Sequence, residues 1–520
     1  MSLSRRGFLA ATALGATVGA FNGFDARAAP PAITRDEPAY SSLVRRGYNR
    51  RFIAQPDRIH TPSSTAELLE AVQRSVRDDL RIAVRSGGHG FDDFVDGADT
   101  KALIDLQRLN TVDWDPELRA FSIGAGTDLD TVYRELARWG VTVPGGLCLG
   151  VGVGGHISGG GFGPLSRQFG LVADHLYGVE VITVDATGKA TLALATRDGP
   201  NRDLWWAHTG GGGGNFGIVT RFLLRSPASD GTDPTLALPR VPETVLIGQL
   251  DLPMPMVTED SFLRLLRNYL DFHDQHRDPG DPFTNVFARL AVRPLIESFT
   301  DLLVFSYGEP AETQSRLDEF LTAVSAGVTP SPIVLPPVRL GYLDSIGSYY
   351  APPPPIPGRI KIKAALLRQP YTDSQLRVLY RALTDPALKR ETFLEFSPLG
   401  GAINAVAPDA TAMPARDTMM KMLLHAAWND PADDDRFISW VRKTYAEVYA
   451  ETSSVPVPGQ RDGGSYINYP DPDLADPLWN TSATPWHELY YAGNYPRLQR
   501  VKSVWDPKNN FRHQLSVQPG

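Results

Sequence analysis

Residues 145–170 have the sequence GGLCLGVGVGGHISGGGFGPLSRQFG, in which eleven of 26 positions are glycine. A glycine inside a helix or strand costs up to about 1 kcal/mol relative to alanine, because it loses more backbone freedom on ordering. The sequence therefore predicts a loop here, with no packed helix or strand. Such a loop presents many backbone N–H groups and lets the chain approach a ligand closely, which suits an extended pyrophosphate or a flat ring.

Within this loop, residues 150–155 satisfy the pattern G-x-G-x-x-G of dinucleotide-binding sites. That fingerprint requires a preceding strand and a following amphipathic helix. Here the glycines continue at 159–161 and exclude such a helix. The pattern by itself is therefore weak support for a dinucleotide fold of that type.

Regular elements are predicted on both sides of the loop. Ser64 and Glu67 have the spacing of a capping box, and the apolar residues after them recur on one helical face, which predicts a helix over 64–78. Apolar patterning also predicts a helix at 128–139 and strands at 80–84, 103–106, 121–123, 179–184 and 218–224. The alternation of helices and strands indicates an α/β arrangement for this part of the chain.

Residues 235–455 have a different texture, with longer helices between strands. The predicted helices span 262–276, 313–325, 373–385 and 434–451, and the predicted strands span 284–292, 301–307, 392–397 and 419–427. The run Pro352–Pro355 is expected in a loop of this part, and a helix near 494–504 is expected close to the C-terminus. We expect a separate domain in which helices cover a sheet.

The composition is that of an ordinary globular protein, with 42% hydrophobic and 21% charged residues. The net charge is −8 and the basic residues are scattered, which argues against a nucleic-acid partner. After the N-terminal segment no stretch approaches 18 consecutive apolar residues, so no stable membrane association is expected. Cys148, the one cysteine, excludes an intramolecular disulfide and a cysteine-rich metal site.

The N-terminal segment has three features of an export signal in succession. Arg5-Arg6 is followed by a weakly apolar run to about Phe21 and then by small residues near 26–29. The order Ser-Arg-Arg-Gly-Phe-Leu at 4–9 resembles the twin-arginine export motif. We therefore expect residues 1–29 to be a signal peptide and the protein to be exported by the twin-arginine route, as a periplasmic or secreted protein.

Two reactive side chains stand out beside the glycines. His89 lies in Arg85-Ser-Gly-Gly-His-Gly90 directly after a predicted strand, a position from which side chains often face a cleft. Taken singly, His89 fits a hydrogen-bonded loop histidine as well, and Cys148 fits a small buried hydrophobic residue. In an exported protein, however, a solitary thiol in a glycine loop meets oxidants unless something caps it, as a covalent cofactor would.

His89, Cys148 and His156 are all competent zinc ligands. Neither neighbouring pair has the short spacing that usually fixes two ligands together, and a fourth ligand is not evident. A nucleophilic Cys–His pair is a further alternative, but no orienting Asn or Asp and no oxyanion loop can be identified. We predict no metal site.

Several segments together resemble the berberine-bridge-enzyme-like flavin oxidases of the vanillyl-alcohol-oxidase superfamily. They occur in family order from about residue 45 to the C-terminus, and the chain looks most like bacterial exported members that oxidise alcohol groups on sugars and natural products. The segments are Arg85–His89, Cys148 with the glycines 152–163, Tyr466-Ile-Asn-Tyr469, Asn494-Tyr-Pro-Arg-Leu498 and Trp505-Asp-Pro-Lys-Asn-Asn-Phe511.

The resemblance implies an α+β fold with two domains, in which residues 31–230 and 460–520 bind FAD and residues 231–459 form a substrate domain of antiparallel sheet covered by helices. It also implies two covalent bonds to FAD, from His89 to the 8α-methyl group and from Cys148 to C6. The remaining implied cofactor contacts are Arg85, Ser86, Gly87, Gly88, Gly90, Gly152, Gly154, Gly155, His156, Ser158, Gly159, Gly160, Gly161, Ile218 and Asn468.

The implied chemistry is removal of a hydroxyl proton by a base while a hydride passes from carbon to the flavin. Tyr469 falls where related alcohol oxidases place this base, but a tyrosine with its ordinary pKa near ~10 needs a neighbour that favours the phenolate, and the sequence does not name it. Tyr466 and Glu395 are further candidates. Alternatively, Tyr466 and Tyr469 form an aromatic core pair, and Glu395 is a solvated strand residue.

One position departs from the pattern of some related bacterial oxidases. Those enzymes have a second active-site tyrosine in the glycine loop, where this chain has Phe162. A mechanism with two tyrosines therefore does not transfer.

The sequence thus predicts an FAD-dependent oxidase that converts a secondary or hemiacetal alcohol of a sugar or natural product to a carbonyl, with O2 reduced to H2O2. The expected partners are the small-molecule alcohol and O2, and the expected state is a monomer or small homo-oligomer. Two alternatives remain, an oxidative cyclase that forms a carbon–carbon or carbon–heteroatom bond and a flavin-retaining binding protein without turnover.

Overall fold

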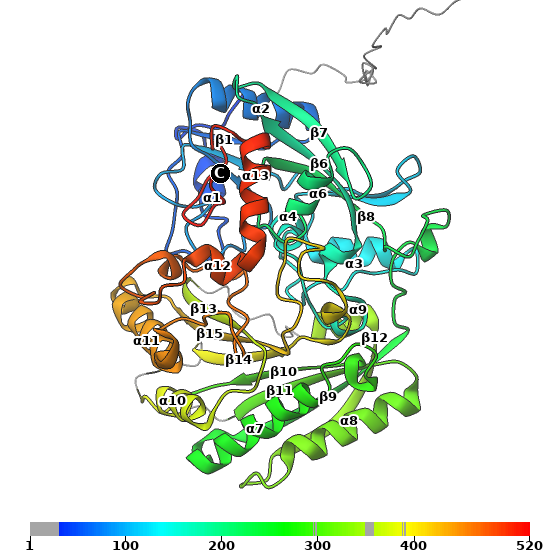
Figure 1. Cartoon of the computed structure of the whole chain (residues 1–520), viewed down its shortest axis with the longest axis vertical. Helices are drawn as coiled ribbons and strands as arrows, with labels where there is room; N and C mark the ends of the chain where they lie inside the picture. Colours follow the sequence, from blue (N-terminus) through cyan, green and yellow to red (C-terminus); the bar gives the residue numbers. More distant parts are fainter. Residues whose placement is uncertain (1–30, 295, 297–298, 349–357, 387, 389–391) are drawn as a thin grey trace, which may run out of the picture.

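The computed structural model describes residues 31–294, 296, 299–348, 358–386, 388 and 392–520. The predicted signal peptide and the run Pro352–Pro355 lie outside these residues. Two parts lie one above the other in Figure 1, the upper built around two small sheets and the lower around one large sheet. None of the described helices combines the length and apolarity that a membrane span requires.

The upper part contains one parallel and one antiparallel sheet. The parallel sheet has the strand order β1-β3-β2, and the antiparallel sheet has the order β4-β5-β8-β6-β7. Their strands are β1 Arg58–His60, β2 Ile82–Arg85, β3 Ala102–Asp105, β4 Val112–Asp115, β5 Ala120–Gly124, β6 Leu176–Val184, β7 Ala190–Thr196 and β8 Ile218–Leu224.

The lower part is built on a seven-stranded antiparallel sheet with the order β12-β9-β11-β10-β14-β15-β13. Its strands are β9 Thr244–Pro253, β10 Val286–Val292, β11 Phe299–Tyr307, β12 Ile333–Gly341, β13 Arg359–Leu367, β14 Phe393–Pro398 and β15 Met420–Trp428. Together with the parallel sheet above, this confirms the predicted α+β class with a separate antiparallel substrate-type domain.

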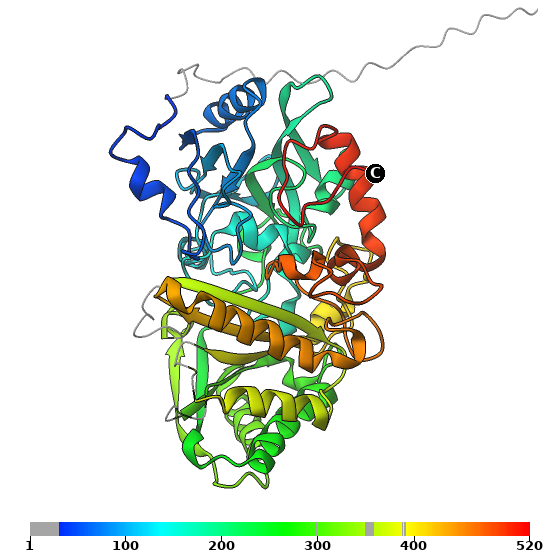
Figure 2. The same cartoon turned by 90° about the vertical axis from the view of Figure 1, so that its left-hand side faces the viewer.

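Helices cover one face of the large sheet and leave the other face toward the upper part (Figures 1 and 2). The covering helices are α7 Glu259–Gln275, α8 Pro310–Ser325, α10 Asp373–Leu383 and α11 Asp434–Val448. α8 packs on β9 and β11, and α11 packs on β13 and β15. α9 Tyr342–Ser348 follows the edge strand β12. Because helices shield only one face, the polar side chains on the other face are available to a site between the two parts.

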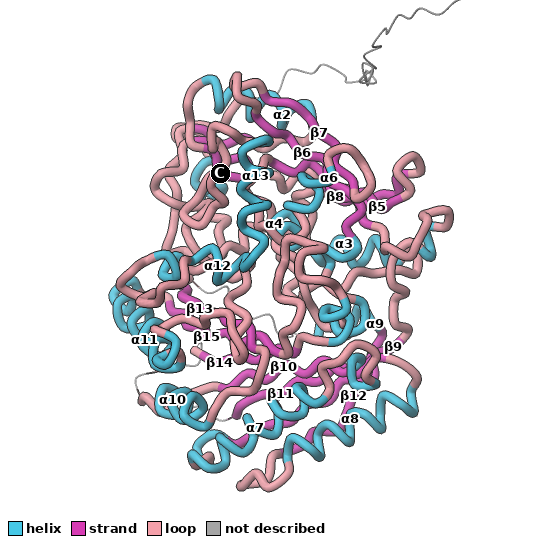
Figure 3. The backbone as a smooth tube through the Cα atoms, viewed as in Figure 1, coloured by secondary structure: helices cyan, strands magenta, loops and turns pink. Residues whose placement is uncertain are grey.

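Most helices of the upper part are short, and long loops connect them (Figure 3). They are α1 Tyr40–Val44, α2 Thr65–Arg77, α3 Leu129–Ala137, α4 Val153–Ser158, α5 Ser166–Phe169 and α6 Arg202–Ala207, with α12 Trp486–Tyr491 and α13 Tyr495–Trp505 near the C-terminus. α13 packs on α6, and Arg497 pairs with Asp203 at 2.5 Å. The last residues of the chain thus return to the upper part.

Most elements predicted from periodicity are present. The helix at 64–78 is α2, and Ser64 accepts a hydrogen bond from the Glu67 backbone N–H as a capping residue does. The strand predicted at 80–84 is β2 and begins two residues later, at Ile82. The predicted α/β alternation was incomplete, because the larger sheet of the upper part is antiparallel.

One expectation was wrong, and several strands were missed. The glycine loop contains the helices α4 and α5, although we expected none, and both are short enough that few glycines have to be ordered in helical form. The strands β1, β4, β7, β9, β12 and β13 were not predicted. β12 carries Pro336 and Pro337 at a bulge, which removes the regular alternation, and it lies at the sheet edge, where proline is tolerated.

Candidate functional site

His89 follows β2 and faces the glycine loop. A Cβ atom at Gly150 would lie 3.2 Å from Nε2 of His89, and a Cβ atom at Gly87 would overlap the backbone of Gly152, so only glycines allow this approach. The Tyr48 ring stacks on His89, with centroids 4.8 Å apart and planes 14° apart. Burial lowers the pKa of His89 to about 4, so the imidazole is neutral at neutral pH.

The glycine loop turns around His156. The Nε2 atom of His156 accepts a hydrogen bond from the Gly146 N–H at 3.3 Å, and burial lowers its pKa to about 4. A Cβ atom at Gly161 would lie 2.9 Å from this imidazole. At Gly155, in contrast, a Cβ atom would meet no atom within 4 Å, so this part of the loop faces open space.

Cys148 is partly buried in the same loop. Its negative charge, when ionised, raises the pKa of three phenols, Tyr48, Tyr133 and Tyr469, and Tyr48 and Tyr469 come from distant parts of the chain. The interaction between two charges weakens as their separation grows, so an effect on a pKa indicates that the groups are neighbours. Cys148 thus lies near Tyr469 and near Tyr48, which stacks on His89.

Tyr466 and Asn468 hold the glycine loop by hydrogen bonds. The hydroxyl oxygen of Tyr466 accepts hydrogen bonds from the Gly161 N–H at 2.9 Å and from Nδ2 of Asn468 at 2.9 Å. Asn468 also donates to the carbonyl of His156 at 2.9 Å. Burial raises the pKa of Tyr466, which keeps it protonated. These contacts favour a structural role for Tyr466 over the base role that was one of our hypotheses.

Tyr469 lies between the two parts of the molecule. Its ring stacks on Phe91, which follows His89 by two positions, with centroids 5.6 Å apart. The ammonium group of Lys421 of β15 lies over its ring, with Nζ 4.8 Å from the ring centroid. Burial raises the pKa of Tyr469, Lys421 lowers it, and the Glu395 carboxylate raises it. The pKa of Tyr469 is raised overall, and Lys421 is the neighbour that favours its phenolate.

One of our interpretations made Glu395 of β14 a solvated strand residue. The structure contradicts it, because the side chain is largely buried. Its carboxylate accepts hydrogen bonds from Nε of Arg289 at 2.9 Å and from Nζ of Lys421 at 2.7 Å. The two cations hold the pKa of Glu395 well below its usual range, against the effect of burial. A carboxylate so stabilised is a weak base, so its contacts favour a role in holding Lys421.

Register places these charges together. Glu395 lies opposite Leu423 of β15 and Ala291 of β10, so its diagonal neighbours on the same face are Lys421 and Arg289. Arg289 also forms an ion pair with Asp301 of β11, at 2.9 Å. The result is a row of alternating charges across four strands, ending at Tyr469.

The remaining predicted cofactor residues are close to the same loops. Ser86 donates to the carbonyl of Ala125 at 2.6 Å and accepts from the Gly154 N–H at 3.3 Å, which ties the His89 loop to α4. Ser158 donates to the carbonyl of Gly154 at 2.7 Å within α4. Ile218 is the buried first residue of β8.

Arg85 differs from the other predicted cofactor contacts. Its guanidinium is buried and pairs with Asp96 and Asp105 and with the carbonyl of Leu43. The side chain is therefore engaged within the protein, and Arg85 is left to act on a ligand through its backbone alone.

Gly88 and Gly160 have φ angles of 78° and 115°, which suit glycine.

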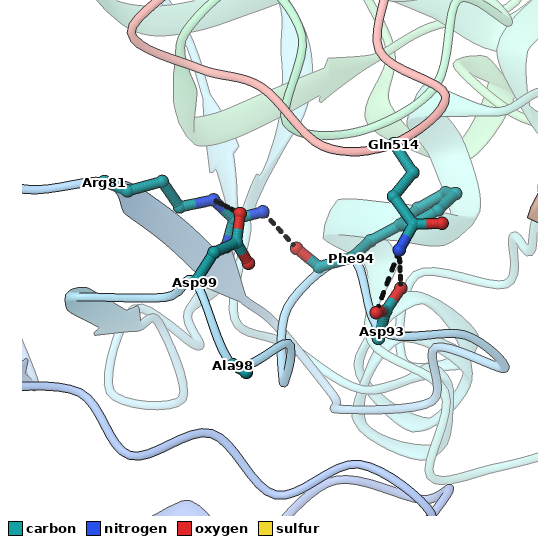
Figure 4. Close-up of a pocket in the computed structure, with 6 residues that line it drawn as sticks. All are labelled: Arg81, Asp93, Phe94, Ala98, Asp99 and Gln514. Atoms are coloured by element: carbon teal, nitrogen blue, oxygen red, sulfur yellow. Dashed lines mark hydrogen bonds and ion pairs between the residues drawn. The ribbon is translucent and has the colours of Figure 1, made fainter.

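A separate depression of about 230 Å³ lies beside the 93–99 loop (Figure 4). It is lined by Arg81, Asp93, Phe94, Ala98, Asp99 and Gln514. Arg81 pairs with Asp99 at 3.3 Å, and Gln514 donates to Asp93 at 2.9 Å. No predicted site residue lines it. Within the described part of the chain, no three His, Cys, Asp or Glu side chains are grouped as a metal site would require.

Sequence reasoning missed four residues of this site. Tyr48 and Phe91 flank His89 and Tyr469, and Lys421 and Arg289 reach the site from β15 and β10. An isolated lysine in the buried, apolar strand 420–428 was a usable signal, because a buried cation requires a partner. The aromatic residues carried no comparable signal.

Comparison with known proteins agrees with this arrangement. Residues 56–191 match a family described as an FAD binding domain, and residues 465–518 match one described as berberine and berberine like. The chain is 43% identical to the aclacinomycin-N/aclacinomycin-A oxidase of Streptomyces galilaeus over 95% of this chain and 91% of that protein. It is 31% identical to the hexose oxidase of Chondrus crispus over 93% of this chain and 94% of that protein.

A solved structure shows the same fold over nearly the whole chain. The glycopeptide hexose oxidase DBV29, complexed with teicoplanin, superposes with a TM-score of 0.89 at 44% identity, covering 94% of this chain and 99% of that one. Fold and site thus define an FAD-linked oxidoreductase with a two-domain fold of the vanillyl-alcohol-oxidase type. The chain belongs to the berberine-bridge-enzyme-like family of FAD-binding oxidases.

The residues present fit FAD. The glycine loop faces open space at Gly155, where a flat or extended group can lie against the backbone. Among the described residues, none forms a hydrogen bond with a ring nitrogen of His89, which is neutral and therefore nucleophilic. The site thus offers both a backbone cradle and a reactive side chain.

Proposed function

We propose that the protein oxidises a secondary or hemiacetal alcohol of a sugar or natural product to a carbonyl, with O2 reduced to H2O2. The observation that carries the proposal is the position of Lys421, whose Nζ lies 4.8 Å from the ring centroid of Tyr469, next to the Phe91 ring that follows His89. The names of two relatives, an aclacinomycin oxidase and a hexose oxidase, support this substrate range.

In this proposal Tyr469 takes the hydroxyl proton of the substrate. Bound FAD supplies a hydride acceptor. The ammonium group of Lys421 favours the phenolate of Tyr469, and Glu395 holds Lys421 in place at 2.7 Å. Phe91 fixes the plane of the Tyr469 ring by stacking on it. The base is thus positioned from both parts of the molecule.

We further propose that His89 and Cys148 bind FAD covalently and that the glycine loop, His156 and Asn468 hold it. The neutral imidazole of His89 and the position of both residues beside the glycines support this assignment. Two bonds would fix the ring relative to Tyr469. Export by the twin-arginine route, with loss of residues 1–29, remains part of the proposal, and the mass of the secreted protein tests it.

The proposed function is tested by intact-protein mass and by peroxide release. We expect the added mass of FAD on the wild-type chain, its loss in the double variant His89→Ala with Cys148→Ala, and peroxide from members of a panel of sugar and natural-product alcohols. A product two hydrogens lighter without ring closure identifies alcohol oxidation over cyclisation. Absence of covalent flavin, or turnover of Tyr469→Phe as fast as wild type, would refute the corresponding assignment.

A further inference from the structure

Residues 48 and 49 contact the loop that carries His89 on both sides of that residue. The backbone N–H of Tyr48 donates to the carbonyl of Gly88 at 2.8 Å. Nδ2 of Asn49 donates to the carbonyl of Phe91 at 2.7 Å. Between these two hydrogen bonds, the Tyr48 ring lies flat against the His89 imidazole. Three contacts from two consecutive residues therefore fix the position of one side chain.

The ring stack controls the orientation of the imidazole. The terminal torsion of a histidine is broad and has no strong preference of its own, so a neighbouring plane decides it. A plane 14° from that of the imidazole covers one face and leaves the nitrogen atoms at the ring edge. Rotation of His89 would break the stack, so the edge is held in one direction.

Asn49 connects this element to the large sheet. Its side chain is 3% exposed, donates to the carbonyl of Ile360 at 3.0 Å and accepts from the Ile360 N–H at 3.0 Å. Ile360 belongs to β13, which pairs with β15. The His89 loop is thus braced against the sheet that carries Lys421.

We propose that Tyr48 and Asn49 are positioning residues for the covalent attachment of FAD through His89. Tyr48 sets the direction of the imidazole edge. Asn49 fixes the distance between the His89 loop and β13 of the large sheet. The inference rests on the attachment proposed above. Neither residue acts on the substrate.

The attachment is an oxidation, and its atoms balance with O2 as the oxidant. A bond forms between a ring nitrogen of His89 and the 8α carbon of FAD, and one C–H bond of that methyl group and the N–H bond of the neutral imidazole break. The two protons and two electrons released pass to O2 and leave as H2O2. A nitrogen displaced from its reactive geometry slows this step steeply.

The test uses Cys148→Ala as background, so that only the bond from His89 is measured. Full-length protein is incubated with FAD, and the covalently modified fraction is followed by intact mass. We expect Tyr48→Leu to slow incorporation on the order of tenfold to a hundredfold and Asn49→Ala to slow it by about tenfold. Tyr48→Phe keeps the ring and is expected to incorporate FAD at the rate of the background protein. Tyr40→Leu removes a ring of the same segment away from His89 and is the matched control.

The outcomes separate this inference from the function on which it rests. Incorporation in Tyr48→Leu as fast as in the background protein overturns the inference. Covalent flavin that persists when both His89 and Cys148 are alanine overturns the attachment itself, and the positioning role with it. If Tyr48→Leu does not fold, Tyr48→Met, which fills the space without a ring plane, carries the same test.

Discussion

Replacing Lys421 by methionine should move the pH dependence of turnover toward higher pH. Lys421 is the positive group that opposes the rise in the pKa of Tyr469 caused by burial. Methionine has a similar length and no charge, so the cavity stays filled while the stabilisation of the phenolate is lost. If Tyr469 reacts as a base, turnover then requires a higher pH.

The size of the effect follows from the geometry. A unit charge 4.8 Å from the Tyr469 ring contributes about 3.5 kcal/mol at an effective dielectric constant of about 20, equivalent to about 2.5 in pKa. Glu395 remains in the variant and still raises the pKa of Tyr469, so it does not offset the loss of the Lys421 charge. We therefore expect the acidic limb of the flavin-reduction rate to move up by about 2 pH units.

The assay is flavin bleaching under anaerobic conditions, measured against pH by rapid mixing so that reoxidation does not contribute. Lys421→Arg keeps the charge and is the control, with an unchanged limb expected. Glu395→Gln should move the limb the other way, because Glu395 raises the pKa of Tyr469. An unmoved limb in Lys421→Met, with bleaching otherwise intact, would refute the assignment of Tyr469 as the base that Lys421 tunes.

Two further predictions concern stability. Burial raises the pKa of Asp92 to about 7, so the free energy of unfolding falls as pH rises from about 4 to about 7 and stays lower above that range. Asp92→Asn removes this loss, so the variant should be more stable than wild type by about 2–4 kcal/mol at pH 8 but not at pH 4. Urea unfolding at the two pH values measures the difference, and a lower stability of the variant at pH 8 would contradict the prediction. Gly159→Ala should cost about 1–3 kcal/mol, because its Cβ would overlap the Asn468 carboxamide that holds His156 and Tyr466. Gly493→Ala, where a Cβ would meet no atom within 4 Å, is the control, and an equal loss in both variants would contradict the explanation.

Local patterns predicted much of the fold. Helices such as α7 and α11 have an apolar periodicity, and strands such as β10 and β15 are apolar runs, that can be recognised in the local sequence. The strand β12 could not be predicted in this way, because its prolines and exposed side chains fit an edge position that only the sheet order creates. The short helix α4 was missed because its glycines are unfavourable locally and acceptable only in packed surroundings.

The candidate site was predictable only in part. His89, Cys148, the glycine loop and the motif at 466–469 are visible because each combines an unusual residue with a turn or a strand end. The roles of Tyr466 and Glu395 could not be read, since they depend on which groups lie opposite. The Tyr466 hydroxyl accepts one hydrogen bond from a backbone N–H and one from a side-chain amide, and two cations hold the Glu395 carboxylate.

The sequence by itself determined which residues can react and that a glycine-rich backbone surrounds them. The tertiary structure decided which neighbours control them. Lys421 and Arg289 meet Glu395 because three antiparallel strands adopt one register, and a shift by one residue would turn each side chain to the other face. Asn49 binds Ile360, which lies 311 positions further along the chain. Contacts between distant loops and strands are set by packing and leave no pattern in the local sequence.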